Sequence, residues 1–194
     1  MKRVCVFCGS SVGARPVYRQ MATAMGGELA RRGLGLVYGG GNVGLMGAVA
    51  DSALAAAGAV VGVIPDFLEA REIAHGGLTE LRVVGSMHER KAAMAELSDA
   101  FVALPGGYGT FEEFFEILTW AQLGLHRKPV GLLDVEGYYT PLLRFLDRAV
   151  EEQFLSPTLR SLVLEESDPA RLLDRLASYE PRTVDKWIER DTQT

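Results

Sequence analysis

The sequence is poor in the residues that bind transition metals. It contains two cysteines and three histidines among 194 residues. Cys5 and Cys8 lie three positions apart on an expected strand, where their side chains point to opposite faces, and no second cysteine pair is present to complete a zinc site. His75, His88 and His126 are scattered without ligand spacing. We therefore expect no metal site, with Cys5 in the core and Cys8 at a strand end.

Long apolar runs are also missing from the chain. None reaches the roughly 18 residues of a membrane span, and the run at 3–7 is too short for the core of a signal peptide. Internal repeats, low-complexity segments and linkers are absent too. We expect a cytoplasmic protein with a single domain, 1–194, in which residues 181–194 form a peripheral tail.

The chain has no excess of positive charge. Its 20 Lys and Arg residues are outnumbered by 25 Asp and Glu residues, for a net charge of −5. A broad surface for nucleic acid or anionic membrane needs the opposite sign. Any phosphate group must then be held by local donors, which favours a small ligand over a polymer. We expect no nucleic-acid and no membrane partner.

Apolar, strand-like runs alternate with helical patterns along most of the chain. Strands are expected near 3–8, 34–38, 59–64, 81–84, 99–104 and 129–133. Helices are expected near 16–32, 44–57, 86–97, 110–124, 138–152 and, after a stretch of weak signal, 168–178. Such alternation predicts an α/β fold, a Rossmann-like three-layer sandwich with a mostly parallel sheet covered by helices on both faces. Gly26 and Gly27 fall inside the first helix, which indicates close packing against a neighbour.

The segment PGGYGTFEE at 105–113 joins glycines to carboxylates between an expected strand and an expected helix. Glycine allows a tight turn close to a ligand, and the free N–H groups at the helix start attract an anion. Glu113 falls in the first turn of the expected helix, where it suits the cationic part of a phosphorylated ligand. The alternative is that Glu112, Glu113 and Glu116 are only charges that favour the helix start.

Two further turns of small residues follow strands. The segment 38–47 contains Gly-x-Gly-x-x-Gly spacing from Gly39 to Gly44, with Asp66 farther on, as in dinucleotide sites. This match is weak alone, because the fingerprint usually follows the first strand rather than the second. Turns at one edge of a parallel sheet form a common crevice. We expect four residues of these turns to contact the ligand: Gly9, Ser10, Gly40 and Gly41.

A capping box marks the start of another helix. Ser86 and Glu89 have the required spacing, and Arg90 and Lys91 lie in the first two turns. Both cations share a helix face with methionines, which would be expected to be buried. We expect the Arg90 guanidinium to bind a ligand phosphate or to lie beside Glu113. The alternative is that both cations are surface charges whose apolar stems cover the core.

Taken together, these motifs closely resemble the LOG family, the cytokinin riboside 5′-monophosphate phosphoribohydrolases once labelled lysine decarboxylase-like. The resemblance rests on SMHERKAAM at 86–94, PGGYGTFEE at 105–113 and YGGGNVGLMG at 38–47. It extends to CGSS at 8–11 and TWAQLGLHRKP at 119–129, and covers about residues 4–155. The pattern is specific for the family but less so for the substrate, since relatives with the same sheet include nucleotide hydrolases and non-enzymatic carriers.

The resemblance implies hydrolysis of the N-glycosidic bond of an N6-substituted adenosine 5′-monophosphate to the free base and ribose 5-phosphate, with AMP as a second substrate. The family's catalytic arginine and glutamate match Arg90 and Glu113. It also implies a homodimer and no cofactor. Its substrate contacts, which include both catalytic residues, further match Glu72, Lys91, Gly107, Tyr108, Gly109, Thr110, Phe111, Glu112 and Thr119.

The chemistry of such a reaction suits these side chains. Cleavage of a ribosyl–adenine bond builds positive charge on the sugar, so a carboxylate near C1′ both stabilises that charge and accepts a proton from water. Glu113 suits both tasks. Arg90 stays protonated, so it positions groups but cannot protonate the leaving base. The sequence does not identify that acid: Glu112, Glu116 and water all remain candidates.

Parts of the sequence are also compatible with three functions other than hydrolysis. A nicotinamide-dependent oxidoreductase would use Gly39 to Gly44 with Asp66 but would leave Arg90 and Glu113 without roles. A pyridoxal-phosphate decarboxylase needs a Schiff-base lysine, and only Lys91 lies near the expected site. The remaining alternative is a carrier or sensor that binds a nucleotide or molybdopterin cofactor without turnover, which the Arg90–Glu113 pair disfavours.

Overall fold

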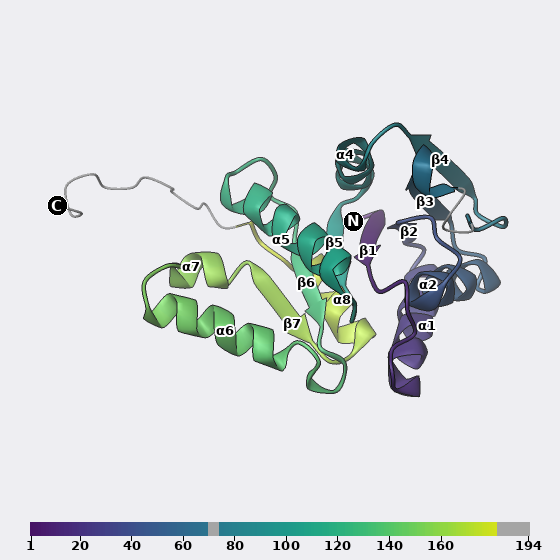
Figure 1. Ribbon diagram of the computed structural model, residues 1–194. Helices are drawn as coiled ribbons and strands as arrows, with labels where there is room; N and C mark the ends of the chain where they lie inside the picture. The colour runs from purple at the N-terminus through teal and green to yellow at the C-terminus, as the bar shows by residue number, and fades with distance from the viewer. Residues whose placement is uncertain (70–73, 182–194) are drawn as a thin grey trace.

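A seven-stranded parallel sheet runs through the centre of the protein. The structure is a computed structural model and describes residues 1–69 and 74–181. The strands lie in the order β4-β3-β2-β1-β5-β6-β7, and every pairing between them is parallel (Figure 1). Their bounds are β1 Arg3–Phe7, β2 Gly35–Tyr38, β3 Val60–Pro65, β4 Glu80–Val84, β5 Ala100–Ala103, β6 Val130–Leu133 and β7 Val163–Glu166.

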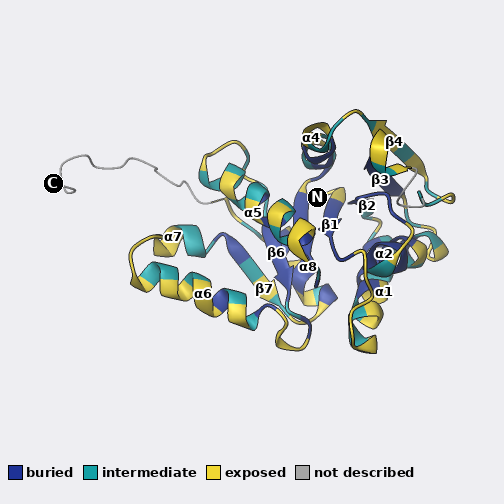
Figure 2. Ribbon diagram, in the orientation of Figure 1, coloured by how far each residue is buried: buried dark blue, intermediate teal, exposed yellow. Residues whose placement is uncertain are grey.

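Burial follows strand position within this sheet. The five inner strands are almost wholly buried, whereas the edge strand β4 is largely accessible and the edge strand β7 is partly buried (Figure 2). Strands covered on both faces need apolar residues at every position, which is why the inner strands read as continuous apolar runs. The edge strands lack that requirement and carry charged residues, among them Glu80, Glu165 and Glu166.

Helices cover both faces of the sheet and give it three layers. On one face, side chains of α1, α2 and α8 pack against the sheet side that includes Val4 and Val6. On the other face, α4, α5 and α6 pack against the side that includes Cys5 and Phe7. The helices are α1 Pro16–Arg31, α2 Gly44–Ala55, α3 Asp66–Glu69, α4 Met87–Leu97, α5 Tyr108–Gln122, α6 Thr140–Glu151, α7 Pro157–Arg160 and α8 Pro169–Ala177, with a 3₁₀ turn at Val135–Gly137.

The predicted α/β fold with a parallel sheet and helices on both faces is confirmed. All six predicted strands and all six longer helices are present within a few residues of their predicted bounds. The prediction missed β7, whose Val163-Leu164-Glu165-Glu166 sequence has two apolar residues followed by two carboxylates. No helix in the described part of the chain is long and apolar enough to cross a membrane.

The chain reverses its direction across the sheet between β1 and β5. It moves outward from β1 through β2 and β3 to β4, then returns to place β5 on the other side of β1. The loops that follow β1 and β5 therefore lead to helices on opposite faces of the sheet. Such a switch point opens a crevice at the carboxyl ends of the strands, which is where open α/β folds bind their ligands.

The two glycines inside α1 have different surroundings. A Cβ atom at Gly26 would lie 2.2 Å from the carbonyl oxygen of Val49 in α2, whereas one at Gly27 would meet only the Ser52 hydroxyl, at 3.4 Å. Gly26 thus lets the two helices approach closely, as the sequence indicated. A hydrogen bond of 2.6 Å from the Ser52 hydroxyl to the Thr23 carbonyl holds the same contact.

We expect Gly26→Ala to lower the free energy of unfolding by roughly 1–3 kcal/mol or more, because the helix backbones must separate. Gly27→Ala is the matched control, and helix propensity predicts a gain of about 0.5–1 kcal/mol. Urea unfolding of both variants and the wild type measures these changes. Equal effects of the two substitutions would contradict the packing argument.

Candidate active site

Three loops at the carboxyl edge of the sheet are joined through Gly9. Its N–H donates to the carbonyl of Pro105, which follows β5, at 3.1 Å, and its carbonyl accepts from Leu45 N–H in α2 at 3.0 Å. A Cβ atom at residue 9 would lie 3.3 Å from Gly106 Cα. The turns after β1, β2 and β5 therefore meet at one point, as the sequence predicted.

The glycines of the dinucleotide-like fingerprint make room for this protein's own groups. Gly44 has φ +63°, and its Cβ would lie 2.2 Å from the backbone carbon of Ser10. A Cβ at Gly39 would lie 2.1 Å from an Arg90 guanidinium nitrogen. The Gly-x-Gly-x-x-Gly spacing thus reflects packing within the protein. This explains why the motif follows the second strand, whereas the dinucleotide fingerprint follows the first.

A cavity of about 220 Å³ opens beside these loops. It brings together eight residues predicted from the sequence: Gly9, Ser10, Arg90, Gly107, Tyr108, Gly109, Thr110 and Glu113. Cys8 and Met46 complete its lining. Met46 was missed, and its place in the first turn of α2, directly after the glycine turn, was the signal that could have identified it. Cys8 lies just beyond β1, where the sequence placed it.

Arg90 projects from α4 to the cavity and is held by main-chain carbonyls. Its side chain donates to Val63 O at 3.1 Å and to Gly39 O at 3.0 Å, and the residue is 6% exposed. The carbonyls belong to β3 and to the residue that follows β2. These bonds compensate for the burial of the guanidinium and fix its position beside the cavity.

The N-terminus of α5 faces the same cavity. Gly107 is the N-cap residue and has no side chain to accept from the first N–H groups. Tyr108, Gly109 and Thr110 form the first turn and line the cavity. Free N–H groups and the positive end of the helix dipole make this an anion site. Gly106 is required beneath it, because a Cβ there would lie 2.1 Å from the Thr110 hydroxyl.

Glu113 lies in the second turn of α5 and not in the first as predicted, because the helix begins at Tyr108. It lines the cavity together with Arg90. Its carboxylate also acts on Cys8. Burial raises the pKa of the Cys8 thiol well above its usual range, and the negative charge of Glu113 raises it further. The cavity therefore combines an anion-binding helix end, a fixed guanidinium and a carboxylate, while Cys8 is held as an unreactive thiol.

Several predicted contacts lie outside this cavity. Lys91 donates to Glu112 at 2.5 Å and to Glu116 at 3.0 Å instead of facing the cavity. Thr119 donates its hydroxyl to the Phe115 carbonyl at 2.7 Å, within α5. Phe111 lines a separate apolar groove between α5 and α6. Their roles in substrate binding remain predictions.

The predicted contacts on the loop after β2 also lie away from the cavity lining. The carbonyl of Gly40 accepts from the His75 N–H at 3.1 Å, and Gly41 forms a bridge with Ala74. Both glycines thus contact the segment that begins at residue 74. Glu72 lies outside the described residues.

A family model described as "Possible lysine decarboxylase" matches residues 46–176 of this chain. The cytokinin riboside 5′-monophosphate phosphoribohydrolase LOG7 of Arabidopsis thaliana is 53% identical over 180 residues, which cover 93% of this chain and 83% of that protein. This chain belongs to the LOG family. A second relative is the probable cytokinin riboside 5′-monophosphate phosphoribohydrolase LOGL6 of Oryza sativa subsp. japonica. It is 52% identical over 181 residues, which cover 93% of this chain and 72% of that protein.

Solved structures of other proteins share the fold of this LOG-family chain. The molybdenum cofactor carrier protein of Chlamydomonas reinhardtii superposes with a TM-score of 0.70 at 23% identity, covering 92% of this chain and 99% of that one. The molybdenum cofactor binding protein of Rippkaea orientalis superposes with a TM-score of 0.66 at 24% identity, covering 92% of this chain and 97% of that one. At such identities the likeness shows the fold alone.

The family model's description as a decarboxylase does not suit the lysine near the site. Burial lowers the pKa of Lys91, but the hydrogen bonds that its ammonium donates to Glu112 and Glu116 outweigh this and raise the pKa overall. A lysine that forms a Schiff base must be readily deprotonated. Lys91 is held in the opposite state, as a charged ammonium between two carboxylates.

We expect neither thiol to react with Ellman's reagent at pH 8 in the folded protein, because Cys5 and Cys8 are buried and the pKa of each is raised. Unfolding in guanidinium should release two thiols per chain. Glu113→Gln removes a neighbouring negative charge and should speed the reaction of Cys8. Rapid reaction of one thiol in the native wild type would contradict this account.

Proposed function

We propose that this protein hydrolyses the N-glycosidic bond of N6-substituted adenosine 5′-monophosphates, releasing the free base and ribose 5-phosphate. The observation that carries this proposal is the joint presence of Arg90, Glu113 and the α5 N-terminus in one cavity. The names of relatives that are 52–53% identical over 93% of the chain support it. We propose that AMP is a second substrate, since it carries the same phosphate, sugar and purine.

The 5′-phosphate would bind at the start of α5. The first-turn N–H groups of Tyr108, Gly109 and Thr110 supply donors and the helix dipole supplies positive potential. Ser10 lines the same cavity. A nucleoside without the phosphate would lack this attachment, so we expect monophosphates to be strongly preferred over nucleosides.

Glu113 would act at the sugar. As the C1′–N bond breaks, its electron pair leaves with the base and positive charge develops on the ribose, where the carboxylate stabilises it. Glu113 also accepts a proton from the water whose oxygen bonds to C1′. Arg90, fixed on the carbonyls of Val63 and Gly39, orients the substrate or Glu113 and donates no proton to the base.

The leaving base requires a proton from another source. Glu112 and Glu116 point their carboxylates at Lys91 rather than into the cavity, which disfavours both as that acid. Water therefore remains the proton donor that fits best. The alternative function, a non-catalytic carrier of a nucleotide or molybdopterin cofactor, has only a likeness of fold in its favour.

Glu113→Gln should reduce the rate by a factor on the order of 10² to 10⁴, or roughly 3–5 kcal/mol, because the amide neither stabilises the sugar cation nor accepts the proton. Release of free base from isopentenyladenosine monophosphate, AMP and isopentenyladenosine, followed by chromatography, measures it. Glu96→Gln, an exposed carboxylate on α4, is the control and should retain activity. Nucleotide binding without base release by the wild type would support the carrier instead.

We further propose that the protein is a cytoplasmic homodimer with one nucleotide-binding domain per chain and no nucleic-acid or membrane partner. A groove of about 380 Å³ between α5 and α6 supports self-association, because its lining is apolar and surface patches of this kind commonly form interfaces. Exposed aromatic residues nearby include Phe115 and Phe145.

Light scattering should therefore give twice the 21.0 kDa mass of one chain. Phe115→Arg, which places a charge in the groove, should shift the mass toward the monomer. A monomeric wild type at micromolar concentration would contradict the dimer and leave the hydrolase proposal untouched.

A further inference from the structure

An ion triad joins the two helices that carry the proposed catalytic pair. The ammonium of Lys91 in α4 lies 2.5 Å from Glu112 Oε1 and 3.0 Å from Glu116 Oε1, both in α5. The Lys91 side chain is 10% exposed, against 53% for Glu112 and 24% for Glu116. Lys91 and Glu116 are thus the more buried members, and the contact spans 25 residues of sequence.

The triad is offset from the catalytic pair by a single residue on each helix. Lys91 follows Arg90, and Glu113 lies between Glu112 and Glu116. Residues four apart share a helix face, whereas adjacent residues point about 100° apart. Glu112 and Glu116 therefore lie on one face of α5, where both contact Lys91. This contact fixes the rotation of α5 about its axis, and with it the direction in which Glu113 points. Rotation of α5 by one residue would turn Glu113 out of the cavity.

Removal of one partner from the triad should destabilise the contact between α4 and α5, because it leaves a buried charge without compensation. Burial disfavours the charge on Lys91, and the two carboxylates compensate for this. The second oxygen of Glu116, Oε2, is itself buried and has no hydrogen-bond partner within the described residues. Glu116 consequently depends on Lys91 for compensation of its own burial, which makes their relative position well defined.

We propose that the Lys91–Glu116 contact is a clamp that sets the position of Arg90 relative to Glu113, and that Glu116 is therefore a positioning residue for hydrolysis. The inference rests on the proposed function. It assigns Lys91 to the joining of α4 and α5, in place of the substrate contact that the family resemblance implied. Displacement of a reacting group by about 1 Å is enough to lower a rate up to 10²-fold.

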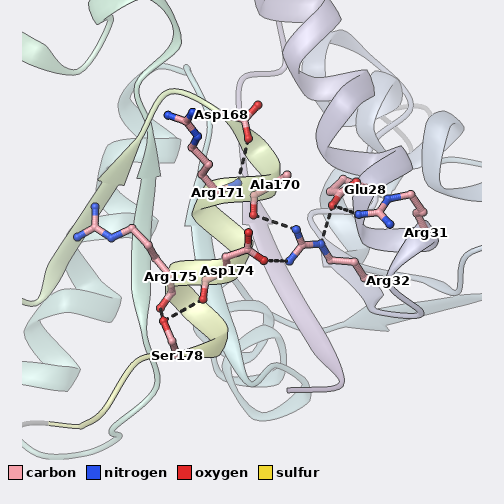
Figure 3. A network of polar contacts seen from close by, with 9 residues as sticks. All are labelled: Glu28, Arg31, Arg32, Asp168, Ala170, Arg171, Asp174, Arg175 and Ser178. Carbon is pink, nitrogen blue, oxygen red and sulfur yellow. Dashed lines mark hydrogen bonds and ion pairs between the residues drawn. The ribbon is translucent and has the colours of Figure 1, made fainter.

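The chain contains a similar ion cluster far from the cavity, which supplies a matched control. Arg32, the residue after α1, contacts Glu28 at 2.6 Å, Asp174 of α8 at 2.6 Å and the Ala170 carbonyl at 3.0 Å (Figure 3). Its side chain is 21% exposed. Arg32 lies at the carboxyl end of a helix, and therefore at the opposite edge of the parallel sheet from the cavity. Loss of this cluster should affect stability alone.

The test compares Glu116→Gln, Lys91→Met and their double variant with Arg32→Met. We expect each clamp variant to lower kcat for isopentenyladenosine monophosphate about tenfold or more, with KM changed less than threefold. The double variant should be no worse than the poorer single variant, because both remove one contact. Lys91→Arg should restore part of kcat. Arg32→Met should lower Tm by several degrees and leave kcat unchanged.

A rise of KM of tenfold or more in Lys91→Met, with kcat retained and Glu116→Gln like the wild type, would overturn the clamp and make Lys91 a phosphate ligand. Amide hydrogen exchange provides a readout without substrate. Exchange of the hydrogen-bonded amides of α4 and α5 beyond their first turns should quicken in both clamp variants but not in Arg32→Met, and unchanged exchange would also overturn the proposal. Absence of base release from the wild type would reject the proposed function separately.

Discussion

Arg90 donates from a buried guanidinium to the main-chain carbonyls of Val63 and Gly39, and much of the site is arranged around this charge. The strand ends supply the acceptors, and Gly39 leaves the space that the guanidinium occupies. Because burial of a charge is costly without such partners, α4 is confined to one position over β2 and β3. The switch between β1 and β5 then brings the α5 N-terminus and Glu113 to the same cavity.

Most of the fold could be predicted from the sequence, because the inner strands are buried on both faces and therefore consist of continuous apolar runs. The prediction missed β7, since an edge strand such as Val163–Glu166 has no need of that pattern. The site was predicted where chemistry depends on local sequence, as in the turn from Gly107 to Thr110. It was less well predicted for Lys91, because the partners of a side chain depend on how two distant helices pack, which periodicity does not reveal.

The scaffold and the side chains of this protein determine different properties. Molybdenum cofactor carriers share the fold, so the architecture alone does not determine whether a ligand is bound or hydrolysed. In this chain the carboxylate of Glu113 and the fixed cation of Arg90 line the same cavity as the start of α5. Lys91 is paired with two carboxylates, which does not suit a decarboxylase.

Because Arg90 is held by main-chain carbonyls, the sequence around this site can change in evolution without loss of the bonds that hold the guanidinium. A carboxylate partner is lost in a single substitution, but a carbonyl is present whatever side chain occupies the position. Substitutions along β3 can therefore accumulate without releasing the guanidinium, provided that residue 39 remains without a side chain. The side chain of Tyr108, which is 93% exposed at the rim of the cavity, has no comparable restriction. That rim is thus free to change over evolutionary time while the charged centre is inherited intact.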